Sequence, residues 1–201
     1  MLDRYALPLI RPVADASARA LVRMGIGANT VTWVGFSIGM LASFLIATEH
    51  HFTPAIALFA SRICDALDGA VARQTQTTDA GAFLDITLDF LFYARVPLAF
   101  AIANPSQNAL PAAVLLTAFI GTGASFLAFA TLAAKRGMRS TDYPTKSFYF
   151  LGGLTEGTET LACFAAMCAW PQHFAALAYA FAGLCAVTTA TRIWWGWKAF
   201  G

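Results

Sequence analysis

The sequence DALDGAVARQTQTTDAGAFLDITLD, residues 65–89, sets two pairs of aspartates at helical spacing, Asp65 with Asp68 and Asp85 with Asp89. On helices that turn about 100° per residue, the members of the first pair lie about 60° apart and those of the second about 40° apart. A short polar turn, residues 74–78, separates the pairs. The stretch therefore predicts two adjacent helices that bring four carboxylates together.

The surrounding chain is strongly apolar. Of its 201 residues, 58% are hydrophobic and 12% are charged, and the mean hydropathy is +0.62. Soluble domains have about 45–50% apolar and about 25% charged residues. This composition excludes an ordinary soluble protein and predicts an all-α polytopic membrane bundle. The four cysteines lie in apolar segments and are interpreted as reduced packing residues.

We expect one domain over residues 1–201, with six transmembrane helices within residues 30–199, since a span needs about 20 residues. Residues 1–25 alternate apolar side chains with arginines, which favours an interfacial amphipathic segment on an anionic leaflet. A solvated, partly ordered tail is the alternative. No cleavable signal peptide is expected. The six expected spans are residues 30–48, 52–76, 79–103, 110–134, 147–170 and 174–197.

The basic residues predict the orientation. Lys and Arg are absent from the expected turns at 49–53, 104–109 and 170–173. They gather in the N-terminal segment, the 73–78 turn, the 135–146 connection and the C-terminus. Because basic loops stay cytoplasmic, both termini and the aspartates are expected on the cytoplasmic side, in a bacterial inner membrane. Five spans would place the basic C-terminus outside.

The four carboxylates need compensating charge. A charged group within a membrane segment costs about 2.5–3.5 kcal/mol, so four would cost about 10 kcal/mol. An ion-pair network with Arg62, Arg73 and Arg95 is one solution. Clustered carboxylates suit hard divalent cations better, and two Mg²⁺ or Mn²⁺ ions would balance all four charges. The pattern therefore favours a metal site.

The motif Asp65-x2-Asp68-Gly69-x2-Ala72-Arg73-x7-Gly81-x3-Asp85-x3-Asp89 resembles the signature of the CDP-alcohol phosphotransferases at every fixed position. Residues 27–32 also resemble the segment that this family often carries before its first span, with Ala28 in place of the usual proline. The resemblance implies a reaction in phospholipid biosynthesis: a CDP-linked lipid, usually CDP-diacylglycerol, reacts with an alcohol to give a phosphodiester and CMP.

The resemblance also implies roles for individual residues. Asp65, Asp68 and Asp85 are expected to bind metal, and Asp89 is expected to be the base and also to touch a metal. The residues expected at the CDP moiety are Asp65, Asp68, Gly69, Ala72, Arg73 and Gly81, with Asn29 and Thr32 as weaker candidates. The expected partners are the CDP-lipid, the alcohol and membrane lipids, with no nucleic acid, and a homodimer is implied.

The acceptor is less defined by the sequence. Lys146 and Arg192 lie next to apolar segments and suit a phosphorylated alcohol. Glu156 is expected about two turns inside the fifth span, with Glu159 close by. An intramembrane carboxylate marks function by default. Glu156 is therefore expected either to bind the acceptor or to pair with Arg62 or Arg95.

A divalent-cation transporter that uses the same four aspartates as its ion site is the alternative function. Transporter sites lie near the bilayer midplane. The two aspartate pairs instead converge at one side of the expected bundle. This placement favours the enzyme.

Overall fold

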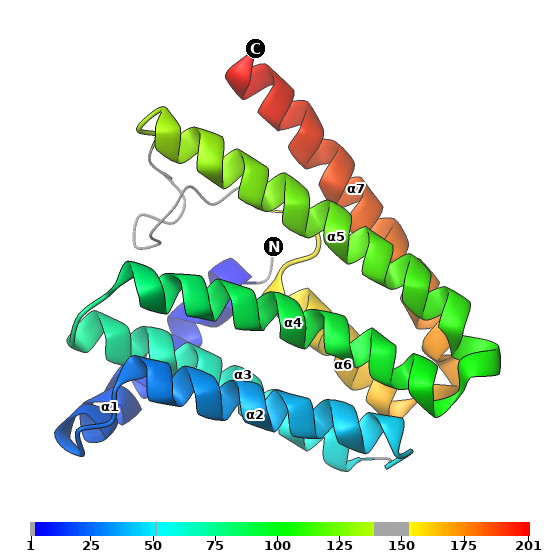
Figure 1. Cartoon of the computed structure of the whole chain (residues 1–201), viewed down its shortest axis with the longest axis horizontal. Coiled ribbons are helices and arrows are strands. Elements are labelled where there is room, and N and C mark those ends of the chain that lie inside the picture. Colours follow the sequence, from blue (N-terminus) through cyan, green and yellow to red (C-terminus); the bar gives the residue numbers. More distant parts are fainter. Residues whose placement is uncertain (1–2, 51, 139–152) are drawn as a thin grey trace.

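The computed structural model describes residues 3–50, 52–138 and 153–201, and this part of the chain is all-helical. Figure 1 shows long helices, several of which run roughly side by side, while the C-terminal helix, in red, crosses them at an angle. The elements are α1 (Asp3–Arg23), α2 (Ala28–Ala47), α3 (Thr53–Gln74), α4 (Asp79–Ala103), α5 (Pro105–Lys135), α6 (Gly157–Ala169), the short 3₁₀ helix η1 (Pro171–His173) and α7 (Phe174–Phe200).

Helix α2 packs closely on both α3 and α4. A Cβ atom on Gly35 would lie 2.7 Å from Cβ of Cys64 on α3, and one on Gly39 would lie 2.5 Å from Cδ2 of Phe92 on α4. These two glycines therefore let α2 approach its neighbours closely, within the chain. These contacts hold the two helices of the aspartate stretch against one scaffold helix.

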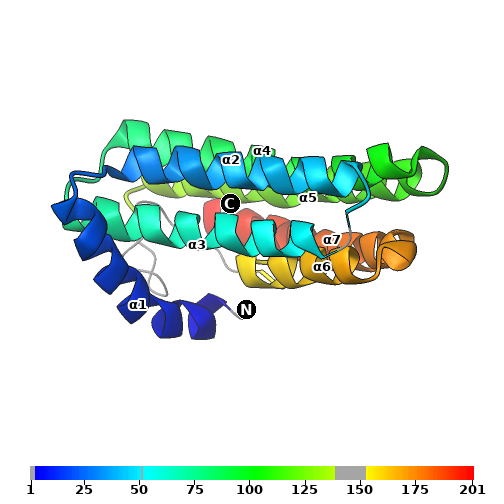
Figure 2. The ribbon, with the colours of Figure 1, turned by 90° about the horizontal axis from the view of Figure 1, so that it is seen from below.

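The larger hydrophobic core extends from Phe92, about one turn after Asp89, toward the far end of the bundle. Phe92, Phe164 and Phe174 are fully buried in it, and the rings of Phe100 and Phe174 stack at 4.6 Å. The view in Figure 2 shows α2, α4 and α5 in one layer and α3, α6 and α7 in the other. The aspartates therefore lie at one end of the bundle, outside the apolar core.

Four described helices are long and apolar enough to cross a membrane: α2, α4, α5 and the segment formed by η1 and α7. Helix α3 carries charged residues in its second half, and α6 has only 13 residues. A multi-pass membrane protein is thus supported with four candidate spans, and the six-span count stays a prediction. Part of the expected fifth span, residues 147–152, lies outside the described residues.

Three expected helix boundaries were wrong. Gly27 is the N-cap of α2, so this helix begins at Ala28, two residues before the expected start at residue 30. The expected turn at 104–109 reduces to Asn104, because Pro105 starts α5 and the Asn104 side chain accepts a hydrogen bond from the Gln107 N–H at 3.2 Å. Helix α6 begins at Gly157, so Glu156 is its N-cap and does not lie inside a span.

The N-terminal segment forms one helix, α1, that packs against the end of α3 nearest the aspartates. Ala14 and Ala18 of α1 are buried against Ala70 and Val71 of α3. Figure 2 shows α1 turning away from the bundle at that end. Leu9 and Val13 are exposed, as suits the interfacial location that the sequence predicts. That location stays a prediction.

Candidate metal centre and active site

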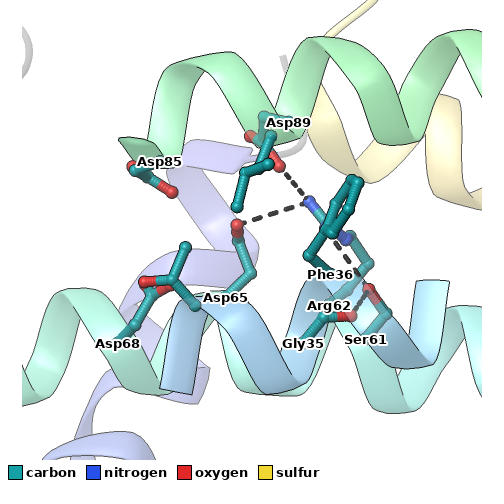
Figure 3. Close-up of a pocket in the computed structure, with 10 residues that line it drawn as sticks. Gly35, Phe36, Ser61, Arg62, Asp65, Asp68, Asp85 and Asp89 are labelled. Atoms are coloured by element: carbon teal, nitrogen blue, oxygen red, sulfur yellow. Dashed lines mark hydrogen bonds and ion pairs between the residues drawn. The ribbon is translucent and has the colours of Figure 1, made fainter. Parts of the chain in front are cut away.

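The four aspartates come from two facing helices. Asp65 and Asp68 lie in the second half of α3, and Asp85 and Asp89 lie in the first half of α4. Thr78 fixes the start of α4, because its hydroxyl oxygen accepts a hydrogen bond from the Gly81 N–H at 3.0 Å. Figure 3 shows the carboxylates of the two helices directed toward one another. The predicted convergence of both pairs is confirmed.

A small, open pocket lies between these helices and α2. It has an acidic side formed by all four aspartates and a second side formed by α2. Its lining consists of Thr32, Gly35, Phe36, Ser61, Arg62, Asp65, Asp68, Asp85, Leu88 and Asp89.

Three of the carboxylates form a group suited to a metal ion. One oxygen each from Asp65, Asp68 and Asp85 lies within 4.8 Å of the others. Asp68 is 5% exposed, and its buried Oδ2 has no hydrogen-bond partner among the described residues. A buried, unpaired carboxylate oxygen is costly unless a cation accompanies it. The donor set is all oxygen, so the residues fit Mg²⁺ or Mn²⁺.

Asp89 lies beside this group but has a different partner. Its Oδ1 accepts a hydrogen bond from Nη1 of Arg62 at 2.6 Å, and the same nitrogen lies 3.4 Å from Oδ1 of Asp65. Both contacts are drawn in Figure 3. Of the three arginines considered as neutralising residues, Arg62 therefore contacts the cluster.

Arg73 pairs with Asp15 of α1 and not with the four aspartates. Its Nη2 lies 3.4 Å from Oδ1 of Asp15 on α1, and the neighbouring Gln74 side chain donates to the Asp15 carbonyl oxygen at 2.9 Å. Asp15 was not among the expected site residues, because the sequence does not show that α1 folds back on α3. The pair ties α1 to the end of the helix that carries the site.

The other residues expected at the CDP moiety lie on the same ends of α2, α3 and α4 as the aspartates. Thr32 lines the pocket, and the exposed Asn29 lies close to Gly81, where a Cβ atom would meet Asn29 Oδ1 at 3.2 Å. At Gly69 a Cβ atom would lie 3.3 Å from Nη1 of Arg73. Ala72 is half-buried one turn after Asp68.

The expected acceptor residues lie on other elements. Arg192 of α7 is 7% exposed and donates from Nη1 to the Thr122 carbonyl oxygen of α5 at 3.0 Å. Its buried Nε has no partner among the described residues. Lys146 lies outside the described residues. Arg192 is therefore a buried cation with donor capacity that no described residue fills.

Glu156 and Glu159 form a capping box. The Glu156 side chain accepts from the Glu159 N–H, and Glu159 Oε2 accepts from the Glu156 N–H at 3.2 Å. Glu156 Oε1 also accepts from the Gly153 N–H at 3.2 Å. The sequence reading missed this role because the usual capping box begins with Ser or Thr. The capping hydrogen bonds account for two carboxylates in an apolar region. Whether Glu156 also binds the acceptor stays a prediction.

Comparison with known proteins identifies the family. A family model described as CDP-alcohol phosphatidyltransferase matches residues 26–194. The chain belongs to this family. The resemblance expected from the aspartate motif is confirmed over most of the chain, and the family acts in phospholipid synthesis. The ion-transport alternative finds no support in this match.

Two kinds of relative share sequence with the chain. It is 51% identical to the inner membrane protein YnjF of Escherichia coli, over 98% of this chain and 96% of the relative. It is 33% identical to an archaetidylinositol phosphate synthase of Pyrococcus horikoshii, over 48% of this chain and 52% of that protein. It is also 36% identical to a phosphatidylinositol phosphate synthase of Streptomyces avermitilis, over 44% of this chain and 37% of that protein.

Solved structures share the fold. A phosphatidylinositol phosphate synthase of Mycobacterium tuberculosis with CDP-DAG bound superposes with a TM-score of 0.73 at 21% identity, over 92% of this chain and 94% of that one. The same enzyme in complex with manganese and citrate gives a TM-score of 0.72 at 21% identity, over 92% of this chain and 88% of that one. The helical arrangement of this family is therefore present here.

Proposed function

We propose that this protein transfers a phosphatidyl group from CDP-diacylglycerol to the hydroxyl of an alcohol and releases CMP. The observation that carries the proposal is the gathering of Asp65, Asp68 and Asp85 within 4.8 Å, with Asp89 in the same pocket, in a member of the CDP-alcohol phosphatidyltransferase family. A protein of the same fold has been solved with CDP-DAG bound, which supports this choice of donor.

The three clustered aspartates would hold Mg²⁺ or Mn²⁺, and two ions would balance the four carboxylates of the site. The structure of the related fold with manganese supports a divalent cation. When bound, such ions place positive charge on the phosphoryl oxygens and on the leaving group. Thr32, Gly69, Ala72, Arg73, Gly81 and Asn29 are proposed to contact or accommodate the CDP moiety around them.

Asp89 is the proposed general base. It takes the proton from the acceptor hydroxyl, whose oxygen attacks the phosphorus that carries the diacylglycerol. The bond from this phosphorus to the bridging oxygen of the diphosphate breaks, and CMP leaves with the electron pair. The products are a phosphodiester lipid, CMP and one proton on Asp89. A positioned carboxylate contributes about 10²–10⁴-fold to such a step.

The proposed acceptor is an alcohol that carries a phosphate. Arg192 is buried and has a free Nε–H among the described contacts, and a buried guanidinium is the preferred partner of a phosphate group. Two partial relatives are named as synthases of inositol phosphate lipids, which favours inositol phosphate over serine. Lys146 and Glu156 are proposed to complete this acceptor site.

The proposed location is the inner membrane with the site facing the cytoplasm. Arg73, Lys135 and Lys198 lie at the helix ends on the side of the aspartates, while the turns at the opposite end, residues 48–50, 104 and 170–173, contain no Lys or Arg. Basic residues stay cytoplasmic. A homodimer, implied by the family resemblance, is part of the same proposal.

The test is CMP release by the purified protein. It is incubated with CDP-diacylglycerol, Mn²⁺ and, separately, inositol 1-phosphate, glycerol 3-phosphate, serine or glycerol. We expect CMP and a new phospholipid with one phosphorylated alcohol, and none after chelation with EDTA. Absence of CMP with every acceptor would refute the donor reaction, and turnover with serine or glycerol alone would refute the phosphorylated acceptor.

A further inference from the structure

A second pocket lies at the end of the bundle opposite the aspartates. It forms where the turn after α2, the turn between α4 and α5, and η1 come together, at the right-hand end of the bundle in Figure 1. Its volume of about 350 Å³ falls in the range of ligand pockets, about 300–1,000 Å³. Its floor is apolar and buried, formed by Ile46, Phe100 and Cys168. None of the four aspartates lines it, so it is separate from the proposed active site.

The rim of this pocket is polar and carries one charge. Its exposed side chains are Glu49, His50, Gln107 and Gln172. Glu49 is the one acidic residue in the lining, and the segments that supply the lining contain no Lys or Arg. A carboxylate beside an apolar floor, with no cation nearby in the chain, attracts a cation from outside. The pocket therefore suits a positively charged group and disfavours an anion.

The backbone of Glu49 has a conformation that favours glycine. Its φ is +59°, and it is the one non-glycine residue with a positive φ among the described residues. Its N–H donates to the Ile46 carbonyl oxygen, and the His50 N–H donates to the Leu45 carbonyl oxygen, both at 3.0 Å. These two hydrogen bonds form a Schellman motif, in which glycine is the usual residue at this position. Strained residues of this kind cluster at functional sites. A carboxylate therefore lies on the rim where glycine would fit the backbone better.

Hydrogen-bond acceptors complete the site. Asn108 is 8% exposed and lines the pocket. Its Nδ2 donates to the Phe100 carbonyl oxygen at 3.0 Å, which leaves Oδ1 as an acceptor that makes no hydrogen bond with the described residues. The side-chain amides of Gln107 and Gln172 offer further acceptor oxygens. A primary ammonium has three N–H donors, which one carboxylate and two amide oxygens can satisfy.

The aromatic content of the lining distinguishes between kinds of ammonium. Quaternary ammonium groups cannot donate hydrogen bonds and are bound by cages of aromatic rings. Phe100 supplies the one six-membered ring of this lining, and that ring is stacked on Phe174 at 4.6 Å. The lining therefore favours a primary ammonium over a quaternary one.

We propose that this pocket binds a primary ammonium group, with Glu49 as the counter-ion and Asn108 as a hydrogen-bond acceptor. Such a group has two sources, the headgroup of an aminophospholipid in the adjoining leaflet and a small free amine. Phe52 and Ile56, at the start of α3, are exposed and offer apolar surface to the acyl chains of a lipid. The proposal does not depend on the reaction at the aspartates.

The experiment measures binding to the purified full chain in detergent. Native mass spectrometry gives the affinities for dioleoyl phosphatidylethanolamine, phosphatidylglycerol and phosphatidylcholine, and calorimetry gives those for ethanolamine and glycerophosphoethanolamine. We expect phosphatidylethanolamine to bind at least about tenfold more tightly than the other two lipids, because they lack hydrogen bonds to a charged group. Binding of the two soluble amines as well identifies the ammonium alone as sufficient. Binding of the lipid alone identifies an aminophospholipid as the ligand.

Glu49→Gln removes the charge and keeps the size of the side chain. The affinity for phosphatidylethanolamine should fall about 10–100-fold, the loss expected for hydrogen bonds to a charged group. Asp79→Asn is the matched control, because it makes the same change from carboxylate to amide at an exposed position in the first turn of α4, outside both pockets. It should bind phosphatidylethanolamine as wild type does.

Glu49→Gly separates binding from folding. Glycine adopts a positive φ without strain, so the midpoint of thermal unfolding should rise by about 2–4 °C, while the affinity for phosphatidylethanolamine falls as in Glu49→Gln. A lower midpoint would make Glu49 a structural residue of the turn and overturn the proposal. So would wild-type binding by Glu49→Gln, equal binding of phosphatidylglycerol or phosphatidylcholine, or no binding of any amine.

Discussion

A Cβ atom on Gly39 of α2 would lie 2.5 Å from Cδ2 and 2.9 Å from Cε2 of Phe92 on α4. The Phe92 ring thus occupies the space that a side chain at residue 39 would need. The Arg62 guanidinium lies over the face of the same ring. Ser61 Oγ lies 3.0 Å from the same position. A larger side chain at residue 39 must displace the ring and disturb the support of Arg62.

We therefore expect Gly39→Val to destabilise the protein by about 1–3 kcal/mol, the usual cost of overpacking, and to lower CMP release. The midpoint of thermal unfolding in detergent measures the first effect. Gly183→Val on α7 is the control, because Gly183 is exposed and has nothing within 4 Å of its Cβ position. Equal midpoints for the two variants would contradict this prediction.

Asp68→Asn tests the metal group directly. Asp68 is buried and has an unpaired Oδ2 among the described residues, and an amide cannot supply the negative charge that a divalent cation needs. Loss of even an outer-shell partner weakens metal binding about 10–100-fold, so at least this loss is expected in a Mn²⁺ titration. Asp79→Asn, in the first turn of α4 but outside the pocket lining, should bind Mn²⁺ as wild type does.

Asp89→Asn should retain Mn²⁺ binding and lose turnover, unlike Asp68→Asn. Because Asp89 lies outside the group of three, Mn²⁺ affinity is expected to persist, while loss of a general base lowers kcat by about 10²–10⁴-fold. The KM for CDP-diacylglycerol should change little. Binding of Mn²⁺ and CMP release are measured on the same preparation. Near-normal kcat would remove Asp89 as the base, and lost Mn²⁺ binding would make it a metal ligand.

The sequence predicted the helices of the site well. The i, i+3 and i, i+4 spacing of the aspartates and the polar turn between them placed α3 and α4 within about two residues of their observed ends. Such periodic signals depend only on local geometry. The predicted convergence of Asp65, Asp68 and Asp85 followed from the same geometry.

Contacts between distant segments were harder to predict. The sequence offered Arg62, Arg73 and Arg95 equally as partners of the carboxylates, and only the packing of α3 and α4 on α2 selects Arg62. Arg73 instead meets Asp15, 58 residues away in the chain. Glu156 was expected inside a span because hydropathy does not reveal where a helix starts. Its capping hydrogen bonds do so.

Arg192→Gln tests the acceptor site. Arg192 is buried and bonded through Nη1 to the Thr122 carbonyl oxygen, which leaves its Nε–H for an anion. Hydrogen bonds to charged groups contribute about 1.5–3 kcal/mol, so the KM for a phosphorylated acceptor should rise about 10–100-fold. The KM for CDP-diacylglycerol and the Mn²⁺ affinity should stay at their wild-type values, because Arg192 is not part of the aspartate pocket.

Lys198→Gln is the control for this variant, since Lys198 lies on the same helix, in its last turn, over the Trp194 ring. It should leave both KM values unchanged. Arg192→Lys retains the charge but not the guanidinium, so it should recover part of the affinity for the acceptor. If Arg192→Gln raises both KM values equally, or lowers the unfolding midpoint enough to explain the loss, Arg192 supports the packing of α5 on α7 and the acceptor's phosphate binds elsewhere.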